Sequence, residues 1–351
     1  MNILQGVSLK LYSTMRLGGI TEYLVCVKTR DELVEAEKWA ESKQLPVITI
    51  GSGSNIIWRD EGYKGLIIVN KIRGFKKLSE DETSATYQVG AGENWDNIVA
   101  KTVDLELQGI ECLSLIPGTA GAAPVQNIGA YGQDVSQTLV SVEAYDRMEA
   151  SFVNIANEQC NFGYRSSRFK TTDKGRFIIC SITLKLSKLS VAPPKYADIQ
   201  AYFHDKNIAL STSSLRKAVI AVRRRKLPDP SKVANCGSYF SNPIISADHF
   251  KKITKKYPHI KKARPGWPQP AVWELPDGQY KVGAGWLVEE AGFSAFRDHA
   301  TGMKLWPKQN LVFINYKAQN TKQLVEFEQK ITDKVYEMFQ INLIREPEIL
   351  P

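Results

Sequence analysis

The sequence predicts that the first half of the chain is an α/β structure with mixed sheets, rather than a regular series of β-α-β units. An amphipathic helix pattern at 29–44 is followed by two apolar runs at 46–51 and 65–70, which are typical of buried strands. Two later stretches, 139–147 and 176–187, alternate apolar and polar residues as half-exposed strands do. Buried and half-exposed strands around a helix indicate mixed sheets.

The first predicted helix has a clear beginning and one apolar face. Thr29 and Glu32 have the spacing of a capping box, in which each side chain bonds to a backbone amide of the other end of the first turn. Leu33, Ala36 and Ala40 then recur at helical spacing and lie on one face. This face is expected to pack on a sheet.

The second half of the chain begins with a change in composition and an expected loop around Pro193–Pro194. Residues 213–226 form a helical pattern that Pro228 and Pro230 stop, because proline cannot continue a helix. Apolar residues recur at helical spacing over 321–339. The other expected elements are a strand and helix at 85–103, short helices at 247–258 and 284–293, and a strand at 309–315.

The composition is that of an ordinary globular protein, since 43% of the 351 residues are hydrophobic and 24% are charged. A chain of this length has room for two or three domains, each with its own core. No apolar run approaches the roughly 20 residues that span a membrane, and the N-terminal residues lack the apolar core of a signal peptide. We therefore expect a cytoplasmic protein without a membrane span.

Cysteine and histidine usage argues against a disulfide framework and against a metal site. The five cysteines are odd in number and form no CxxC pair, and the four histidines are scattered. This pattern suits reduced thiols in a cytoplasm. We expect no bound metal.

The chain carries 46 basic and 37 acidic residues, a net charge of +9, with a basic cluster RRRK at 223–226. Such a cluster can bind nucleic acid through counterion release, or it can be a solvated helix end near a small anionic ligand. No recognition helix or aromatic RNA-binding platform accompanies it. We favour the second interpretation and expect no nucleic-acid partner.

A long run of small residues with almost no charge occupies 114–132, SLIPGTAGAAPVQNIGAYG. Flexible linkers are polar and rich in Gly and Ser, whereas this run carries Leu115, Ile128 and Tyr131. We interpret it as ordered backbone that a large ligand approaches closely. The alternative is close packing of this loop against the rest of the protein.

A second glycine-rich stretch, GSGSN at 51–55, follows an expected strand, so its backbone amides can form a nest for a phosphate. An ordinary tight turn is an equally good interpretation. The dinucleotide fingerprint GxGxxG is absent because Ile56 stands at its last position, and the P-loop pattern GxxxxGK[ST] is absent too. If both glycine-rich stretches bind one ligand, that ligand is long.

Two further motifs carry side chains that could take part in chemistry. FGYRSSRFK, at 162–170, places Arg165 between an aromatic residue and two serines, although most such arginines are surface residues. NCGSYFSNP, at 235–243, places Ser238 after a glycine and before aromatic residues. It is not a GxSxG motif and no histidine is near in sequence, which argues against a hydrolase serine.

These motifs, in their order along the whole chain, resemble those of the UDP-N-acetylenolpyruvoylglucosamine reductase family, flavoenzymes of bacterial cell-wall synthesis. The combination of QNIGAYG, GYRSS and GSYFSNP is highly specific, and KLPDP, AGWLVEEAGF and the terminal EPE add to it. The resemblance implies an α+β protein: an FAD-binding domain of the vanillyl-alcohol-oxidase-like type, made of two α/β subdomains, and a smaller α+β substrate-binding domain. The implied boundaries are 1–70 and 71–228 for the subdomains, with a substrate loop near 190–200, then 229–340 for the substrate-binding domain and 341–351 for a segment that returns to the active site.

The resemblance also implies that FAD lies extended and is held mainly by backbone. GSGSN would receive the pyrophosphate, and the small-residue run would lead toward the flavin. Side chains larger than Ala122 and Ala123 would then push the cofactor off the amides. The implied FAD-binding residues are Gly51, Gly53, Ser54, Asn55, Ile116, Pro117, Gly118, Ala122, Ala123, Gly129, Tyr131 and Arg223.

In the family, NADPH reduces the flavin, which then reduces UDP-N-acetylglucosamine enolpyruvate to UDP-N-acetylmuramate for peptidoglycan synthesis. By match of motif, Arg165 is the cation beside the substrate carboxylate and Glu348 is the acid that helps to stabilise an enolate-like intermediate. Ser238 donates a proton to the neighbouring carbon. We expect a monomer whose implied substrate-binding residues are Tyr164, Tyr196, Lys226, Asn242 and Gln309.

Two places depart from the family's pattern. The stretch 302–310 has fewer Gly and Ala than the family's, and Leu350 stands where the family usually has an arginine. A flavin oxidase or dehydrogenase with another substrate is the alternative enzyme. It would explain the first 185 residues, but neither Ser238 nor the C-terminal glutamate.

Overall fold

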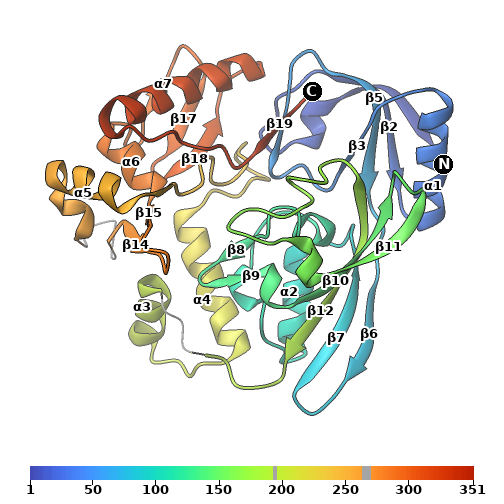
Figure 1. The fold of residues 1–351 in the computed structure, drawn as a ribbon, viewed down its shortest axis with the longest axis horizontal. Coiled ribbons are helices and arrows are strands. Elements are labelled where there is room, and N and C mark those ends of the chain that lie inside the picture. Colours follow the sequence, from blue (N-terminus) through green and yellow to red (C-terminus); the bar gives the residue numbers. More distant parts are fainter. Residues whose placement is uncertain (193–195, 263–269) are drawn as a thin grey trace. The chain divides into compact units, whose positions relative to one another are not determined.

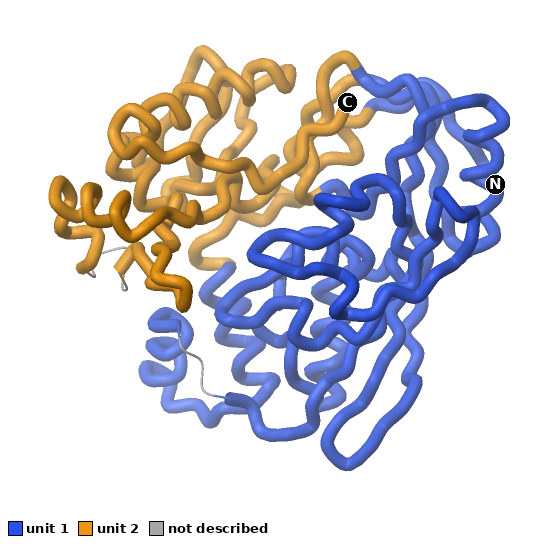
Figure 2. Tube along the Cα trace, viewed as in Figure 1, with its two compact units in different colours: residues 1–8, 20–53, 62–223 blue, residues 9–19, 54–61, 224–351 orange. Residues whose placement is uncertain are grey.

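The computed structural model describes residues 1–192, 196–262 and 270–351, and the chain forms two compact units (Figure 2). Unit 1 comprises residues 1–8, 20–53 and 62–223, and unit 2 comprises residues 9–19, 54–61 and 224–351. Each unit is therefore built from three separate stretches of chain. The predicted division at 70, 228 and 340 concerns cofactor and substrate binding, and it stays a prediction.

The first sheet of unit 1 is mixed, as the sequence predicts (Figure 1). Its strand order is β1 (Ile3–Ser8), β2 (Ile20–Val27), β5 (Tyr63–Asn70) and β3 (Val47–Ile50). Strand β1 is antiparallel to β2, whereas β5 runs parallel to both β2 and β3. Helix α1 (Arg30–Ser42) joins β2 to β3, because strands that run parallel need a long crossover connection, which is usually a helix.

The Thr29 cap and the apolar face of helix α1 are confirmed, but the Glu32 half of the predicted capping box is not formed. The Thr29 hydroxyl accepts a hydrogen bond from the Glu32 amide at 3.1 Å, while the Glu32 carboxylate reaches past it to the Lys28 amide. Leu33 and Ala36 are fully buried. The apolar face of α1 therefore belongs to the core that strands β2 and β5 share.

The second sheet of unit 1 is antiparallel throughout and has the order β11 (Ser151–Ala156), β10 (Leu139–Asp146), β12 (Phe177–Ser187), β7 (Ser84–Gly90) and β6 (Phe75–Glu80). Strand β12 is buried on both faces over residues 178–182, and the expected alternation of buried and less buried residues appears only from Ile182 to Ser187. The reason is that one face belongs to the core with α1 and the other to a second core with helix α2.

Unit 1 also contains the helices α2 (Trp95–Asp104) and α3 (Ala197–Lys206). Helix α4 (Thr212–Lys226) begins in unit 1, and its last three residues belong to unit 2. Helix α2 and the helix that ends before Pro228 match the sequence prediction. Helix α3 was not predicted, and it begins at Ala197, within the expected substrate loop at 190–200. Pro193 and Pro194 lie outside the described residues.

Unit 2 has its own core, in which helix α7 (Thr321–Phe339) buries Leu324, Phe327, Ile331 and Val335, the residues that its helical spacing predicts. The shorter helices are α5 (Ala247–Lys256) and α6 (Ala284–Glu290). Its small sheets are β13 (Ile244–Ile245), β15 (Tyr280–Val282) and β14 (Val272–Glu274); β16 (Arg297–Asp298), β17 (Met303–Trp306) and β18 (Gln309–Asn315); and β19 (Glu348–Leu350) with β4 (Ile56–Trp58).

The described residues contain neither a helix that could span a membrane nor a metal-binding cluster. None of the helices there combines the length and apolar character needed to cross a bilayer. The same part of the chain contains no group of three or more His, Cys, Asp or Glu residues arranged to hold a metal ion.

Candidate active site

The small-residue run at 114–132 is ordered backbone with an unusual conformation. Leu115, Asn127 and Tyr131 have φ values of 57°, 48° and 51°, in the left-handed region that residues with a side chain seldom adopt. Such residues each cost about 1–3 kcal/mol and persist where their surroundings hold them. Clustered strain of this kind is typical of binding and catalytic sites.

Part of the run is small because the protein packs closely around it. A Cβ atom on Gly121 would lie 2.5 Å from the Cβ of Ala91, and the amide of Gly121 donates to the Ala91 carbonyl at 2.9 Å. Ala123 is 1% exposed and belongs to the core with α2. At Gly121 and Ala123 the alternative of close loop packing therefore explains the small side chains. That Ala123 binds FAD stays a prediction.

The two glycine-rich stretches meet within unit 1. A Cβ atom on Gly51 would lie 2.4 Å from Oγ1 of Thr119, closer than real Cβ contacts allow. Gly53 has a φ of 71°, as expected where the turn needs a residue without a side chain. The start of GSGSN thus lies against the run at Thr119, as expected if one long ligand follows both.

Leu115 is held in its strained conformation by side chains from two helices. Its amide donates to Oδ1 of Asp96 on α2 at 2.7 Å, and its carbonyl accepts from Nη2 of Arg223 on α4 at 3.2 Å. Arg216 also forms a two-bond ion pair with Asp96, at 2.7 and 3.1 Å. Burial would raise the pKa of Asp96, but the bonds from Arg216 and Leu115 outweigh it and lower that pKa.

Arg223 carries a donor that fits an acceptor from a ligand. Its Nε is buried and has no hydrogen-bond partner among the described residues, and burial lowers the pKa of its guanidinium. The charges of Tyr131 and Arg165 also act on it. A phosphate or flavin carbonyl oxygen would satisfy this donor. Because Arg223 turns toward Leu115, the basic cluster is not a uniform exposed basic face.

Arg165 occupies a tight turn. The amide of Ser166 donates to the Gly163 carbonyl at 3.2 Å, which closes a four-residue turn. Arg165 is the third residue of this turn and has a φ of 53°, where Gly or Asn is usual. Its Nη2 donates to the carbonyl of Gly129 at 2.7 Å, and its guanidinium lies 5.4 Å from the ring centroid of the exposed Tyr164.

The guanidinium of Arg165 lies next to Gly129, in space that a side chain at position 129 would crowd. A Cβ atom there would lie 3.1 Å from Nη1 of Arg165. Gly129 begins the two-residue strand β8 (Gly129–Ala130), which pairs with β9 (Gln133–Asp134). The turn that carries Arg165 is thereby fixed to the end of the small-residue run.

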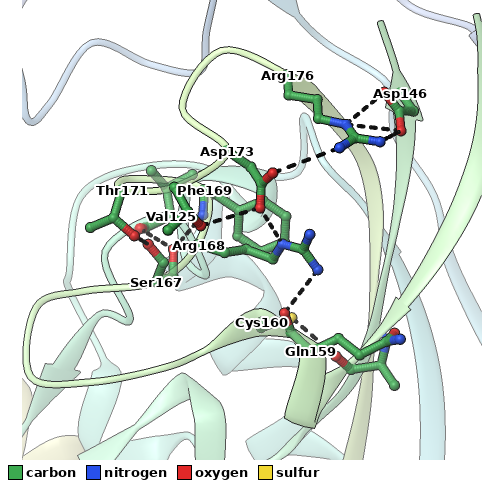
Figure 3. A network of polar contacts seen from close by, with 12 residues as sticks. Val125, Asp146, Gln159, Cys160, Ser167, Arg168, Phe169, Thr171, Asp173 and Arg176 are labelled. Carbon is green, nitrogen blue, oxygen red and sulfur yellow. Dashed lines mark hydrogen bonds and ion pairs between the residues drawn. The ribbon is translucent and has the colours of Figure 1, made fainter. Parts of the chain in front are cut away.

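Figure 3 shows the polar network that holds the rest of this loop. The Ser167 hydroxyl donates to the Val125 carbonyl at 2.6 Å, which adds a second link to the run. Arg168 pairs with Asp173 at 2.6 Å and donates to the Gln159 carbonyl at 3.0 Å. These bonds make the loop after Arg165 a rigid support.

Tyr196 stands at the beginning of α3, not in the middle of a loop. It is the N-cap residue of that helix and is 38% exposed. Its ring meets the ring of Tyr131 edge-on, with centroids 5.5 Å apart. The predicted substrate residue Tyr196 and the predicted cofactor residue Tyr131 are therefore in contact within unit 1.

Ser238 and Glu348 both belong to unit 2. Ser238 forms a β-bridge with Val312 of β18. The carbonyl of the next residue, Tyr239, accepts a hydrogen bond from the Glu346 amide at 2.9 Å. The segments that carry the two predicted catalytic residues are therefore paired neighbours.

Glu348 is held by backbone on a second side. Its amide donates to the Asn55 carbonyl at 3.1 Å, and β19 then runs parallel to β4. The side-chain amide of Asn55 donates to the Glu346 carbonyl at 3.3 Å, so this part of GSGSN supports the glutamate segment. The Leu350 carbonyl accepts from the Arg59 amide at 2.9 Å. Glu348 thus has firm backbone support although position 350 is not an arginine.

The predicted substrate residues of unit 2 form two groups. Lys226 and Gln309 both lie beside Trp306, whose Nε1 donates to the Lys226 carbonyl at 3.0 Å and which pairs with Gln309 at the turn between β17 and β18. Asn242 lies elsewhere, where its Oδ1 accepts a hydrogen bond from the Ala284 amide at 2.9 Å. Asn242 thus stabilises the first turn of α6.

Sequence reasoning missed Asp96, Arg216 and Trp306, which position the predicted residues. Asp96 and Arg216 lie in predicted helices, but their pairing joins residues 120 positions apart and no local pattern shows it. Trp306 stands inside the stretch that departs from the family's pattern, which was the one available signal.

Comparison with known proteins shows which class of protein this is. Residues 21–153 match the FAD binding domain family. The fold resembles that of a VAO-type flavoprotein from Myceliophthora thermophila, with a TM-score of 0.51 and 12% identity over 93% of this chain and 73% of that one. The protein is therefore a flavoprotein with an FAD binding domain.

The family is shown by a match to the C-terminal part of the chain and by relatives that match nearly its full length. Residues 229–350 match the C-terminal domain of UDP-N-acetylenolpyruvoylglucosamine reductase. The reductase of Amoebophilus asiaticus is 36% identical over 350 residues, 99% of each chain, and that of Ralstonia nicotianae is 34% identical over 97% of this chain and 96% of that protein. The chain belongs to the UDP-N-acetylenolpyruvoylglucosamine reductase family.

A solved structure has the same fold over the full length. The UDP-N-acetylenolpyruvylglucosamine reductase from Thermus caldophilus superimposes with a TM-score of 0.66 at 22% identity, and the match covers all of both chains. The predicted α+β fold, with a flavin-binding part of the vanillyl-alcohol-oxidase-like type, is confirmed.

Proposed function

We propose that this protein is an FAD-dependent reductase that uses NADPH to convert UDP-N-acetylglucosamine enolpyruvate to UDP-N-acetylmuramate, a peptidoglycan precursor. The observation that carries the proposal is the pairing of the Ser238 and Glu348 segments through Tyr239 and Glu346 in unit 2. A flavin oxidase with another substrate would explain the FAD-binding half, but neither Ser238 nor the C-terminal glutamate.

FAD would be held in unit 1 mainly by the two glycine-rich stretches that meet at Gly51 and Thr119. When bound, the flavin supplies hydride transfer between NADPH and the sugar substrate. Arg223 would give its buried Nε to an acceptor of the cofactor, and Tyr131 lies near enough to act on its charge. Of the predicted cofactor residues, Ala123 would contribute backbone only.

Three side chains would prepare the enolpyruvyl group for reduction. An enol ether is a poor hydride acceptor unless its carboxylate takes up the developing charge, so Arg165 would hold that carboxylate and Glu348 would donate a hydrogen bond to it. Ser238 would then protonate the neighbouring carbon as general acid. The tight turn of Arg165 and the β-pairing of Ser238 support these roles, because each fixes the backbone of the side chain in question.

The UDP-sugar would be held by the remaining predicted residues. Lys226 would bind the diphosphate, with Gln309 beside it at Trp306, and Tyr196 and Tyr164 present exposed rings in unit 1. We place the reaction in the cytoplasm and expect a monomer. The five cysteines, which form no disulfide, support a reducing compartment.

The test separates the two half-reactions by stopped-flow absorbance of the flavin. Purified protein should be yellow, release FAD on denaturation and oxidise NADPH in the presence of the enolpyruvyl substrate. Ser238→Ala should leave flavin reduction by NADPH within a few fold of wild type, and slow reoxidation by the sugar substrate by roughly 10²–10⁴. Ser238→Cys should recover part of that loss, since a thiol is the stronger acid. Loss of only the NADPH step in Ser238→Ala would make Ser238 a packing residue and refute its proposed role.

A further inference from the structure

A buried polar network in unit 2 joins the segments of Ser238 and Glu348 to helix α7. The hydroxyl of Tyr239 donates to Oε2 of Glu328 at 2.9 Å. Arg345 donates to the same carboxylate through Nε at 3.0 and 3.1 Å and through Nη2 at 2.5 Å. Tyr239 directly follows Ser238, and Arg345 precedes Glu348 by three residues.

The network is enclosed by the core of unit 2. Tyr239 is fully buried, and its ring stacks on Phe313 with centroids 4.0 Å apart and an interplanar angle of 4°. Glu328 is 9% exposed although it is charged. Burial, together with the charge of Glu328, raises the pKa of Tyr239 well above its ordinary value, so its hydroxyl keeps its proton and stays a donor.

Stability alone is a weak reason for such a network. Removing two charges from water costs so much that well-packed apolar residues often replace a buried ion pair without loss of stability. A carboxylate that accepts from both a phenol and a guanidinium does, however, fix the directions of both partners. Backbone bonds on either side, from Tyr239 N to Leu311 O at 2.7 Å and from Ser241 N to Ile344 O at 3.0 Å, extend the same alignment.

We infer that Tyr239, Glu328 and Arg345 form a positioning network, which sets the register of the Ser238 segment against the Glu348 segment and thereby the placement of both catalytic side chains. The three residues act through their neighbours. This inference rests on the proposed function of Ser238 and Glu348.

The test uses the full-length, FAD-loaded protein and the variants Glu328→Gln and Tyr239→Phe. Tyr239→Phe removes a single hydrogen bond and keeps the ion pair between Arg345 and Glu328. It therefore tests the inference even if Glu328→Gln fails to fold. Lys330→Met is the matched control, because Lys330 lies on the same helix α7 and pairs with Asp298 at 2.5 Å, away from both segments.

The first measurement is hydrogen–deuterium exchange, which does not depend on activity. Local opening of the paired segments raises amide exchange there alone. We expect the amides of Tyr239, Ser241 and Glu346 to exchange about tenfold faster in Glu328→Gln, to a smaller extent in Tyr239→Phe, and at wild-type rates in Lys330→Met. Unchanged exchange in Glu328→Gln, or an equal rise in the control, overturns the inference.

The second measurement is the pair of half-reactions. A positioning defect should slow flavin reoxidation by the sugar substrate about tenfold in Glu328→Gln, with FAD content unchanged and reduction by NADPH within about twofold of wild type. Equal loss of both half-reactions together with FAD would show a merely structural role and overturn the inference. A wild-type protein that fails to reduce the enolpyruvyl substrate would instead refute the proposed function, a result that the exchange data do not depend on.

Discussion

One methyl group added at Gly51 should weaken cofactor binding far more than it weakens the fold. The Cβ of Gly51→Ala would lie 2.4 Å from Oγ1 of Thr119, where an ordinary contact begins at about 3.4 Å. Either the Thr119 side chain must rotate away or one of the two stretches must move by about 1 Å. Thr119 resists such movement, because it is 6% exposed and forms a β-bridge with Asn94.

The expected magnitudes follow from this displacement. Overpacking of a close contact costs about 1–3 kcal/mol of folding stability. Moving a binding group by about 1 Å can cost about 10²-fold in function. We expect the dissociation constant of FAD for Gly51→Ala to rise about 10–100-fold, or about 1.4–2.7 kcal/mol. Fluorescence titration of the FAD-free protein with FAD measures this constant, and calorimetry measures the melting temperature.

Two further variants decide whether the clash is the cause. Adding Thr119→Ala to Gly51→Ala removes the clashing oxygen and leaves Cβ at 3.5 Å, an ordinary contact, so FAD affinity should return close to that of Thr119→Ala alone. Gly6→Ala adds strain at a φ of 62° but meets no atom within 4 Å, and it should leave FAD binding unchanged. If Gly51→Ala binds FAD within about twofold of wild type, or if the double variant stays as weak as the single one, the two stretches do not share the ligand.

The remaining predictions concern three other parts of the chain. Asp96 has a lowered pKa in the folded state, so its contribution of about 2 kcal/mol to the free energy of unfolding should be complete above its ordinary pKa of about 4 and lost as the pH falls through the lowered value. Urea unfolding from pH 2 to 7 should show a smaller loss of stability at acid pH for Asp96→Asn than for wild type, and an unchanged profile would contradict the assignment. Tyr196→Phe keeps the ring contact with Tyr131, so the melting temperature should hold while KM for the UDP-sugar rises several fold more than KM for NADPH; parallel changes in both constants would favour a structural tyrosine. Cys26 is exposed and the other four cysteines are buried, and burial raises the pKa of Cys112 and Cys180 to about 12. A disulfide reagent should therefore label about one thiol per native chain and five after denaturation, and rapid labelling of two or more in the native state would argue against the buried positions.

The sequence was most informative where a pattern is local. Helices α1 and α7 could be predicted because their apolar faces follow a 3.6-residue period, and Thr29 marks the start of α1. The short strands β4 and β19 could not be predicted, since each has only three residues and is a strand only because it pairs with the other. The two strands are separated by nearly the whole chain, so no local pattern shows the pairing. Helix α3 falls where two prolines suggest a loop.

The candidate site likewise has residues that the sequence predicts and supporting residues that it does not. Motif resemblance selected Arg165, Ser238 and Glu348, but it gave no information on what holds them. The left-handed turn of Arg165 has no local signature, because Arg is an unusual residue at that position of a turn. Glu328 lies 89 residues from Tyr239, and Asp96 lies 19 residues before Leu115 on another element; only the tertiary structure brings these carboxylates to their partners.

The interleaving of the two units has a consequence for synthesis on the ribosome. Neither unit is a continuous stretch, so neither can finish folding when its first residues emerge. Asn55 must wait for Glu346, 291 residues later, and at about 5–20 residues per second that wait lasts roughly 15–60 s. During that interval β4 has an open edge that another chain could pair with. A chaperone that covers residues 54–61 of the nascent chain would prevent such pairing until β19 has been synthesised.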